Sequence, residues 1–148
     1  MTWQARKFYD SVASELVQHS QTVDVFTCSL DQIGLAEMRE IVSLTGGLVV
    51  QADTFHNPVF KDSMRRLFLK EGEEGFIGLT SNASLEVIPS KDVKVCGMLG
   101  PAARMEKKSP HISDTEVGLG GTTQWRLCGM DSDTTPAVIF EIAGKDSK

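Results

Sequence analysis

The hydrophobic pattern changes its period once along the 148-residue chain, and this change limits the folds that the chain can adopt. Before Lys70 the apolar residues recur every three or four positions, with short continuous apolar runs between them, which is typical of helices that alternate with buried strands. After Gly75 they recur at every second position, as in strands with one buried face. The segment between these two residues is charged and contains glycine. The sequence therefore predicts an α/β unit over residues 1–70 and an all-β unit over residues 76–148.

The first unit starts with an apolar helix face followed by a strand, a helix and a second strand. The helix is predicted over residues 3–19, where one stripe contains Ala5, Phe8, Tyr9, Val12, Ala13, Leu16 and Val17. Mostly apolar, β-branched runs predict strands over residues 23–30 and 48–52. A helix over residues 34–44 lies between them, and Gly46 can take the left-handed conformation that ends it.

A third helix is predicted to begin at Asn57 and Pro58, a capping residue followed by proline at the first helical position. Its inward face is expected to contain Phe60, Met64, Leu67 and Phe68. Helices and strands that alternate in this way predict a parallel sheet covered on both faces. Two strands are too few to cover three helices, so we expect further strands to come from elsewhere.

The second unit is predicted to be antiparallel. Alternating residues around a turn at 89–92 predict a hairpin that contains Leu85 and Val87 in one strand and Val93, Val95 and Leu99 in the other. A loop over residues 100–121 precedes a strand whose buried face contains Thr123, Trp125 and Leu127. A last strand over residues 136–143 is expected to turn Val138, Phe140 and Ile142 inward. Together these strands predict part of a β-sandwich.

The composition favours a cytosolic protein and disfavours several classes of function. The net charge of −5 opposes binding to nucleic acid or to anionic lipid. The chain shows no secretory signal and no apolar run long enough to span a membrane. Cys28, Cys96 and Cys128 are widely spaced, so we expect reduced structural thiols, and the three histidines do not combine with them at a zinc-type spacing.

Two aspartates follow the predicted parallel strands, at the edge where open α/β sheets bind ligands. Asp31 and Asp53 therefore suggest an alternative function, a small α/β domain that binds a ligand or a metal. The other interpretation is that both are loop carboxylates near helix starts, where the helix dipole favours them. The glycines of residues 118–121 are expected to serve a turn or bulge, because a phosphate-binding loop must open a helix and here a strand follows.

No arrangement of residues predicts catalysis. The chain has none of the usual nucleophile or metalloprotease motifs, and Arg65 and Arg66 are expected to form the solvent face of a helix rather than an arginine finger. The best candidates for partner binding are Phe55 and His56, in the loop after the second strand. The alternative for the phenylalanine is packing over the start of its own helix.

Three sequence blocks, Asp24–Met38, Leu44–Gly47 and Gly118–Gly129, have an order and spacing that resemble a known family. This family is the inner-coat subunit of the COPII vesicle coat, the Sec twenty-three family. The likeness extends from about Phe8 to Ile142. It implies that residues 1–70 are the carboxyl-terminal part of a von Willebrand A-like trunk domain and that residues 76–148 are part of a β-sandwich. Members of this family are several times longer, so we expect the chain to be a fragment.

The resemblance also implies a function and a set of partners. Intact relatives activate a Sar-type small GTPase, pair with the cargo-selecting inner-coat subunit and recruit the outer-coat cage during transport from the endoplasmic reticulum to the Golgi. They are cytoplasmic proteins that are peripheral on the endoplasmic reticulum membrane and on COPII vesicles. Their zinc finger and their arginine finger correspond to regions outside this sequence. We therefore expect a structural and interaction role, with no catalytic residue, cofactor or metal in these residues.

Overall fold

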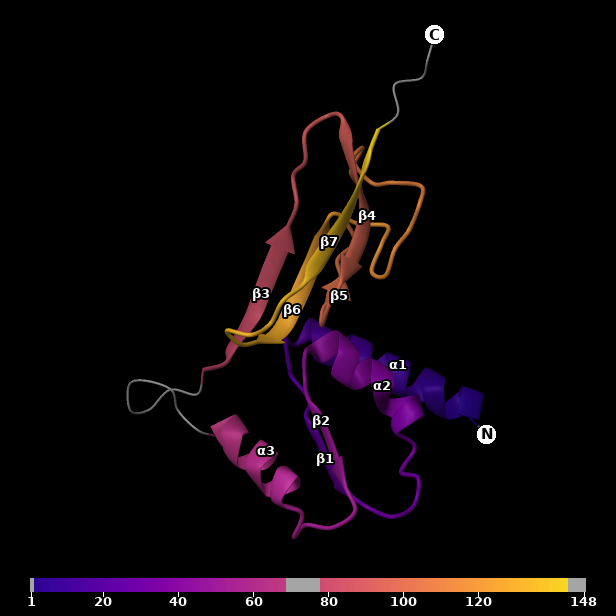
Figure 1. Ribbon diagram of the computed structural model, residues 1–148. Helices are drawn as coiled ribbons and strands as arrows, with labels where there is room; N and C mark the ends of the chain where they lie inside the picture. Colours follow the sequence, from indigo (N-terminus) through magenta and orange to yellow (C-terminus); the bar gives the residue numbers. More distant parts are fainter. Residues whose placement is uncertain (1, 69–77, 144–148) are drawn as a thin grey trace.

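The computed structural model describes residues 2–68 and 78–143 of the protein (Figure 1). Three helices and two strands form an α/β half, residues 2–68: α1 (Thr2–Gln18), β1 (Val25–Cys28), α2 (Leu35–Thr45), β2 (Val49–Ala52) and α3 (Pro58–Phe68). Five strands form a β half, residues 78–143: β3 (Thr80–Glu86), β4 (Val93–Leu99), β5 (Ala103–Arg104), β6 (Gln124–Met130) and β7 (Ala137–Ile142).

The α/β half has the predicted element order. Strands β1 and β2 are parallel, with Val25 opposite Val49. Helix α2 ends where Gly46 adopts φ 74° and its N–H donates to the carbonyl of Val42 at 3.1 Å, which confirms the predicted left-handed cap. Helix α3 begins after Asn57, whose side-chain oxygen accepts a 2.9 Å hydrogen bond from the N–H of Val59.

The helices are less completely covered than the apolar stripes predict. Helix α1 packs on α2, and α3 packs on β2, with Phe60 only 4% exposed. Met64 and Phe68 were expected to face inward, yet their side chains are 45% and 60% exposed. Phe8 on α1 is 61% exposed. The reason is the width of the sheet, since the two strands described are too narrow to cover these faces along their length.

The β half contains two antiparallel sheets, but the predicted hairpin is wrong. Strand β3 pairs with β6 in a sheet of order β3-β6-β5, whereas β4 pairs with β7 in a separate sheet. The chain between β3 and β4 therefore crosses from one sheet to the other. Alternation along a strand specifies which face is buried, and it does not specify which strand is its neighbour.

The core of the β half lies between the two sheets. Its buried members come from β4, β6 and the segment before β5: Val95, Met98, Ala102, Trp125 and Leu127. Val138 of β7 packs against this cluster, as predicted. Phe140 and Ile142 were also expected inside, but they are 49% and 83% exposed because the buried part of that face ends near Val138.

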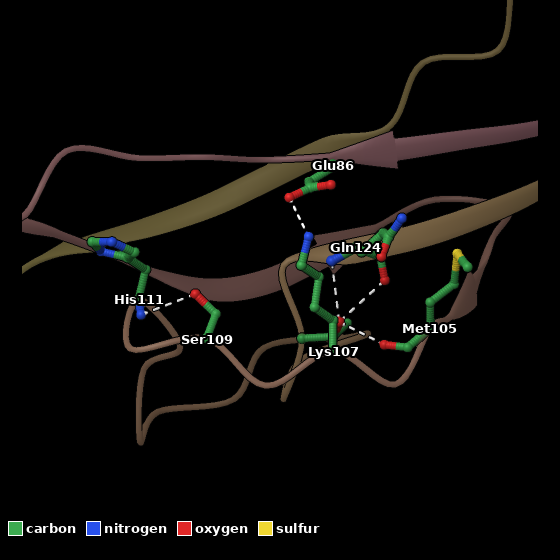
Figure 2. Close-up of polar contacts among 7 residues, drawn as sticks. Glu86, Met105, Lys107, Ser109, His111 and Gln124 are labelled. Atoms are coloured by element: carbon green, nitrogen blue, oxygen red, sulfur yellow. Dashed lines mark hydrogen bonds and ion pairs between the residues drawn. The ribbon is translucent and has the colours of Figure 1, made fainter.

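The loop between β5 and β6 is connected by polar contacts to strands β3 and β6 (Figure 2). Lys107 forms an ion pair with Glu86 of β3. The hydroxyl of Thr122 donates to the carbonyl of Met105 at 2.7 Å and accepts the N–H of Gln124 at 3.1 Å. These contacts give an irregular segment a defined path along the sheet.

The two halves meet at the end of α1 and around two glycines. The guanidinium of Arg126 on β6 donates to the carbonyls of Val17 and Gln18, at 3.3 and 3.2 Å, and so caps the carboxyl end of α1. A side chain on Gly46 would collide with the carbonyl of Gly129. Backbone contact at this position explains why glycine is required there in addition to its role as a cap.

The three cysteines are free thiols, of which Cys96 and Cys128 are buried and Cys28 is partly buried. Burial raises the pKa of Cys128 despite the nearby Arg126 charge. Within residues 2–68 and 78–143, none of the helices has the length and apolar character needed to cross a membrane.

Candidate partner-binding surface

The turn between β2 and α3 is organised by Asp53. Its carboxylate accepts hydrogen bonds from the N–H of Thr54 at 2.9 Å and from the side-chain amide of Asn57 at 3.3 Å. These donors lower the pKa of Asp53, with the Asn57 amide as the largest cause. The hydroxyl of Thr54 accepts the N–H of His56 at 3.2 Å, which closes the loop. The turn therefore has a defined conformation that places Phe55 and His56 on the outside.

Phe55 is both packed and exposed. Its ring lies edge-on to Phe60 of α3, with centroids 5.6 Å apart, and Phe60 in turn meets Phe26 of β1 at 5.9 Å. The side chain of Phe55 is nonetheless 66% exposed, and that of His56 is also exposed. Packing over its own helix start thus accounts for one edge of the ring only. The other side is available to a partner, and the role of both residues in partner binding stays a prediction.

A shallow groove runs along α3 beside this loop. It has a volume of about 430 Å³ and is lined by Phe55, Phe60, Lys61, Met64, Arg65 and Phe68. We call it the α3 groove. Apolar residues that are exposed together in this way are typical of contact surfaces.

The two candidate ligand carboxylates show no sign of a metal site. Asp31 is exposed, and its N–H donates to the hydroxyl of Ser29 at 3.1 Å. The carboxylate of Asp53 already accepts the hydrogen bonds of the turn described above. The pKa of Cys28 is raised chiefly by partial burial and further by the negative charge of Asp53. In the part of the chain that the structure describes, no three acidic, histidine or cysteine residues gather where they could hold a metal ion.

The glycine-rich segment before β6 holds a turn, as predicted. Gly118 and Gly121 have φ values of 59° and 72°, which glycine adopts without strain. The carbonyl of Leu119 within this turn accepts a 2.8 Å hydrogen bond from the indole of Trp125. The segment therefore shapes the β core and leads into strand β6.

A second cavity, which the sequence did not predict, lies between the two halves. Its volume is about 510 Å³. Its walls come from residues around β1 and β2, the end of α3, the start of β3, Pro101 and the end of β6. Its charged lining residues are Asp24, Asp131 and Asp133. Asp24 accepts the N–H of Leu48 at 2.7 Å, and Thr134 holds the pKa of Asp131 below its usual value. The sequence signal that could have suggested a close approach of the two halves at this cavity is the presence of glycine at positions 46, 47 and 129.

Comparison with known proteins identifies the family. Residues 1–68, which end with α3, match the Sec23/Sec24 trunk domain. Protein transport protein SEC23 F of Arabidopsis thaliana is 46% identical over 143 residues, which cover 97% of this chain and 18% of that protein. Protein transport protein SEC23 C of the same plant is 43% identical over 143 residues, which again cover 97% of this chain and 18% of that protein.

The chain belongs to the family of SEC23 proteins and spans 18% of the length of these relatives. The resemblance found in the three sequence blocks is therefore confirmed. The mixed α/β half agrees with a trunk-domain segment, and the antiparallel β half continues the similarity beyond the trunk match.

Proposed function

We propose that this chain provides a structural and protein-binding part of a COPII inner-coat subunit, which acts in vesicle transport from the endoplasmic reticulum to the Golgi. The proposal depends mainly on one observation: across 97% of its length, the chain is 43–46% identical to two SEC23 proteins. Both relatives are named protein transport proteins. The resemblance adds the coat and the transport step.

In this proposal the α/β half is the carboxyl-terminal part of a von Willebrand A-like trunk domain, and the β half belongs to a β-sandwich. The parallel pair β1 and β2 with helices around it supports the first assignment. The exposed faces of α1 and α3 are the surfaces that further trunk strands or partners would cover. Proteins of this kind are cytoplasmic and reach the endoplasmic reticulum membrane and COPII vesicles through the coat.

The proposed partners are those that the family resemblance implies: the cargo-selecting inner-coat subunit, the Sar-type small GTPase and the outer-coat cage. The intact protein would activate the GTPase. The chain itself would bind without activating, because Arg65 and Arg66 lie exposed in the last turn of α3, and no neighbouring group among the described residues orients either as an arginine finger.

Two measurements on the 148-residue chain test this function. Binding to the purified Sar-type GTPase and to the cargo-selecting subunit is measured by calorimetry, and single-turnover GTP hydrolysis is measured with and without the chain. We expect binding to at least one coat component and no acceleration of hydrolysis. An acceleration of about a hundredfold, toward the range that an arginine finger supplies, would contradict the binding-only role.

A pair of variants connects the result to the candidate residues. Phe55→Ser removes an exposed aromatic side chain from the predicted contact. The control, Ile88→Ser, removes an aliphatic side chain that is 82% exposed between β3 and β4. We expect weaker binding for the first and unchanged binding for the second. If the chain binds none of the coat components, the coat function is wrong.

A further inference from the structure

The apolar stripe of α3 continues beyond the part that the described residues of the protein cover. Phe60, Met64 and Phe68 recur at four-residue intervals on one face of the helix, and their exposure increases along it from 4% to 45% and 60%. The first turn packs on the sheet through Phe60, whose ring lies edge-on to that of Phe26 in β1. The later turns present large apolar side chains to the exterior.

This stripe is hollowed rather than flat. Phe60 forms the buried floor of the α3 groove, and Phe55, from the preceding turn, adds a second aromatic side chain to its lining. An aromatic residue whose underside is held by packing and whose outer side is exposed has lost most of its mobility before a partner arrives. Such residues contribute strongly to binding for this reason.

The charge at the rim has one sign. The two charged residues that line the groove are Lys61 and Arg65, whereas the whole chain has a net charge of −5. The ion pairs found among the described residues join Arg104 to Glu116 and Lys107 to Glu86, so neither cation of the groove has a carboxylate partner there. A basic rim on an acidic protein favours a partner with carboxylates.

The backbone around the groove favours a helical partner. The residues that line the groove come from α3 and from the turn before it, and none comes from a strand, so an extended peptide would find no strand edge to pair with in the groove. A helix brings its own backbone hydrogen bonds, and its apolar ridges fit between side chains spaced four residues apart. The eleven residues of α3 rise about 16 Å, which matches a partner helix of about three turns.

We propose that the α3 groove binds an amphipathic helix whose apolar face is flanked by carboxylates. This inference goes beyond the proposed coat function, because it specifies the chemistry of the partner without assuming which protein supplies it. A failure here would leave the GTPase and coat-subunit measurements as they stand.

The test uses two synthetic helical peptides of about five turns with the same leucine face. In one the flanking positions are glutamate and in the other they are lysine. Fluorescence anisotropy with the full 148-residue chain measures the affinity for each. We expect the glutamate peptide to bind at least tenfold more tightly, with an affinity that decreases as salt is added.

Variants at exposed positions locate the site. Phe68→Ser is expected to weaken the glutamate peptide at least tenfold, and the double change Lys61→Glu, Arg65→Glu is expected to reverse the preference toward the lysine peptide. Lys91→Glu, an exposed charge change in the chain between β3 and β4, should leave both affinities unchanged. Circular dichroism spectra establish that each variant retains the fold.

Three results would overturn the proposal. The first is equal affinity for the two peptides, or none for either. The second is that the chain binds vesicles of phosphatidylcholine and phosphatidylserine, loses this binding in the double variant, and shows no preference between the peptides. This result would make the groove a lipid contact. The third is a dimer in sedimentation that Phe68→Ser dissociates, again with no peptide preference, which would assign the face to a second copy.

Discussion

Replacing Trp125 by alanine tests whether the β half is organised around this indole. The side chain is completely buried, lies in the cluster with Val95, Met98 and Leu127, and donates to the carbonyl of Leu119 at 2.8 Å. Loss of a buried tryptophan side chain costs about 3–5 kcal/mol, and loss of its hydrogen bond adds about 1 kcal/mol. A domain of this size is stable by about 5–15 kcal/mol, so Trp125→Ala should remove a large share of the free energy of unfolding.

Urea unfolding followed by far-ultraviolet circular dichroism measures this loss, because the midpoint multiplied by the slope gives the free energy of unfolding. Trp125→Phe separates the two contributions, since it keeps a buried ring and removes the hydrogen bond. Its expected cost is about 1–3 kcal/mol. The matched control is Trp3→Ala on α1, where the indole is 66% exposed and the expected change is below about 0.5 kcal/mol.

The reasoning fails if Trp125→Ala unfolds at the same midpoint and with the same slope as the unaltered chain. It also fails if the Trp3 and Trp125 variants lose equal stability, because the two side chains differ in burial and in hydrogen bonding.

Three further perturbations test other contacts. Gly46→Ala should destabilise by about 2–4 kcal/mol, because it combines positive φ with a collision at Gly129, and Gly78→Ala should change the urea midpoint little because the space around it is open. Arg126→Met should cost about 1–2 kcal/mol through loss of the cap on α1; an unchanged midpoint would show that the cap adds nothing. Asp53→Asn tests the lowered pKa of the Asp53 carboxyl group. The ionised carboxylate stabilises the fold at pH values above the ordinary pKa of 3.8, and this contribution is lost as the pH decreases through the folded pKa. The unaltered chain should therefore be more stable than the variant near neutral pH, and the difference in their free energies of unfolding should decrease on acidification.

The sequence was sufficient to predict the local elements of the α/β half. Gly46 and the Asn57–Pro58 pair fix helix ends through backbone conformation and capping, which depend on a few neighbouring residues. The continuous apolar runs correctly indicated parallel strands. These features are local, so they could be found without knowledge of the rest of the fold.

The predictions that failed depended on contacts between distant residues. The residues of β3 and β4 alternate as a hairpin would, but each strand pairs instead with one near the end of the chain. Phe68 and Ile142 have the spacing of buried residues, yet nothing in the described structure covers them. Phe55 was chosen as a candidate contact because an aromatic residue in a loop can anchor a partner, and its role in binding stays a prediction. The basic rim at Lys61 and Arg65 became visible only when α3 and the preceding turn were placed together.

The crossing of the chain between the two sheets has a consequence for biosynthesis. Leu99 pairs with Ala137 and Val93 with Ile142, so β4 leaves the ribosome well before its partner does. During that interval its apolar residues, including Val95 and Met98, have only part of their final surroundings. Pairings of such long sequence separation form slowly and leave strand edges exposed to other nascent chains. Strands β3 and β4 lack their partners until β6 and β7 have emerged, so protection by chaperones is needed most in that window.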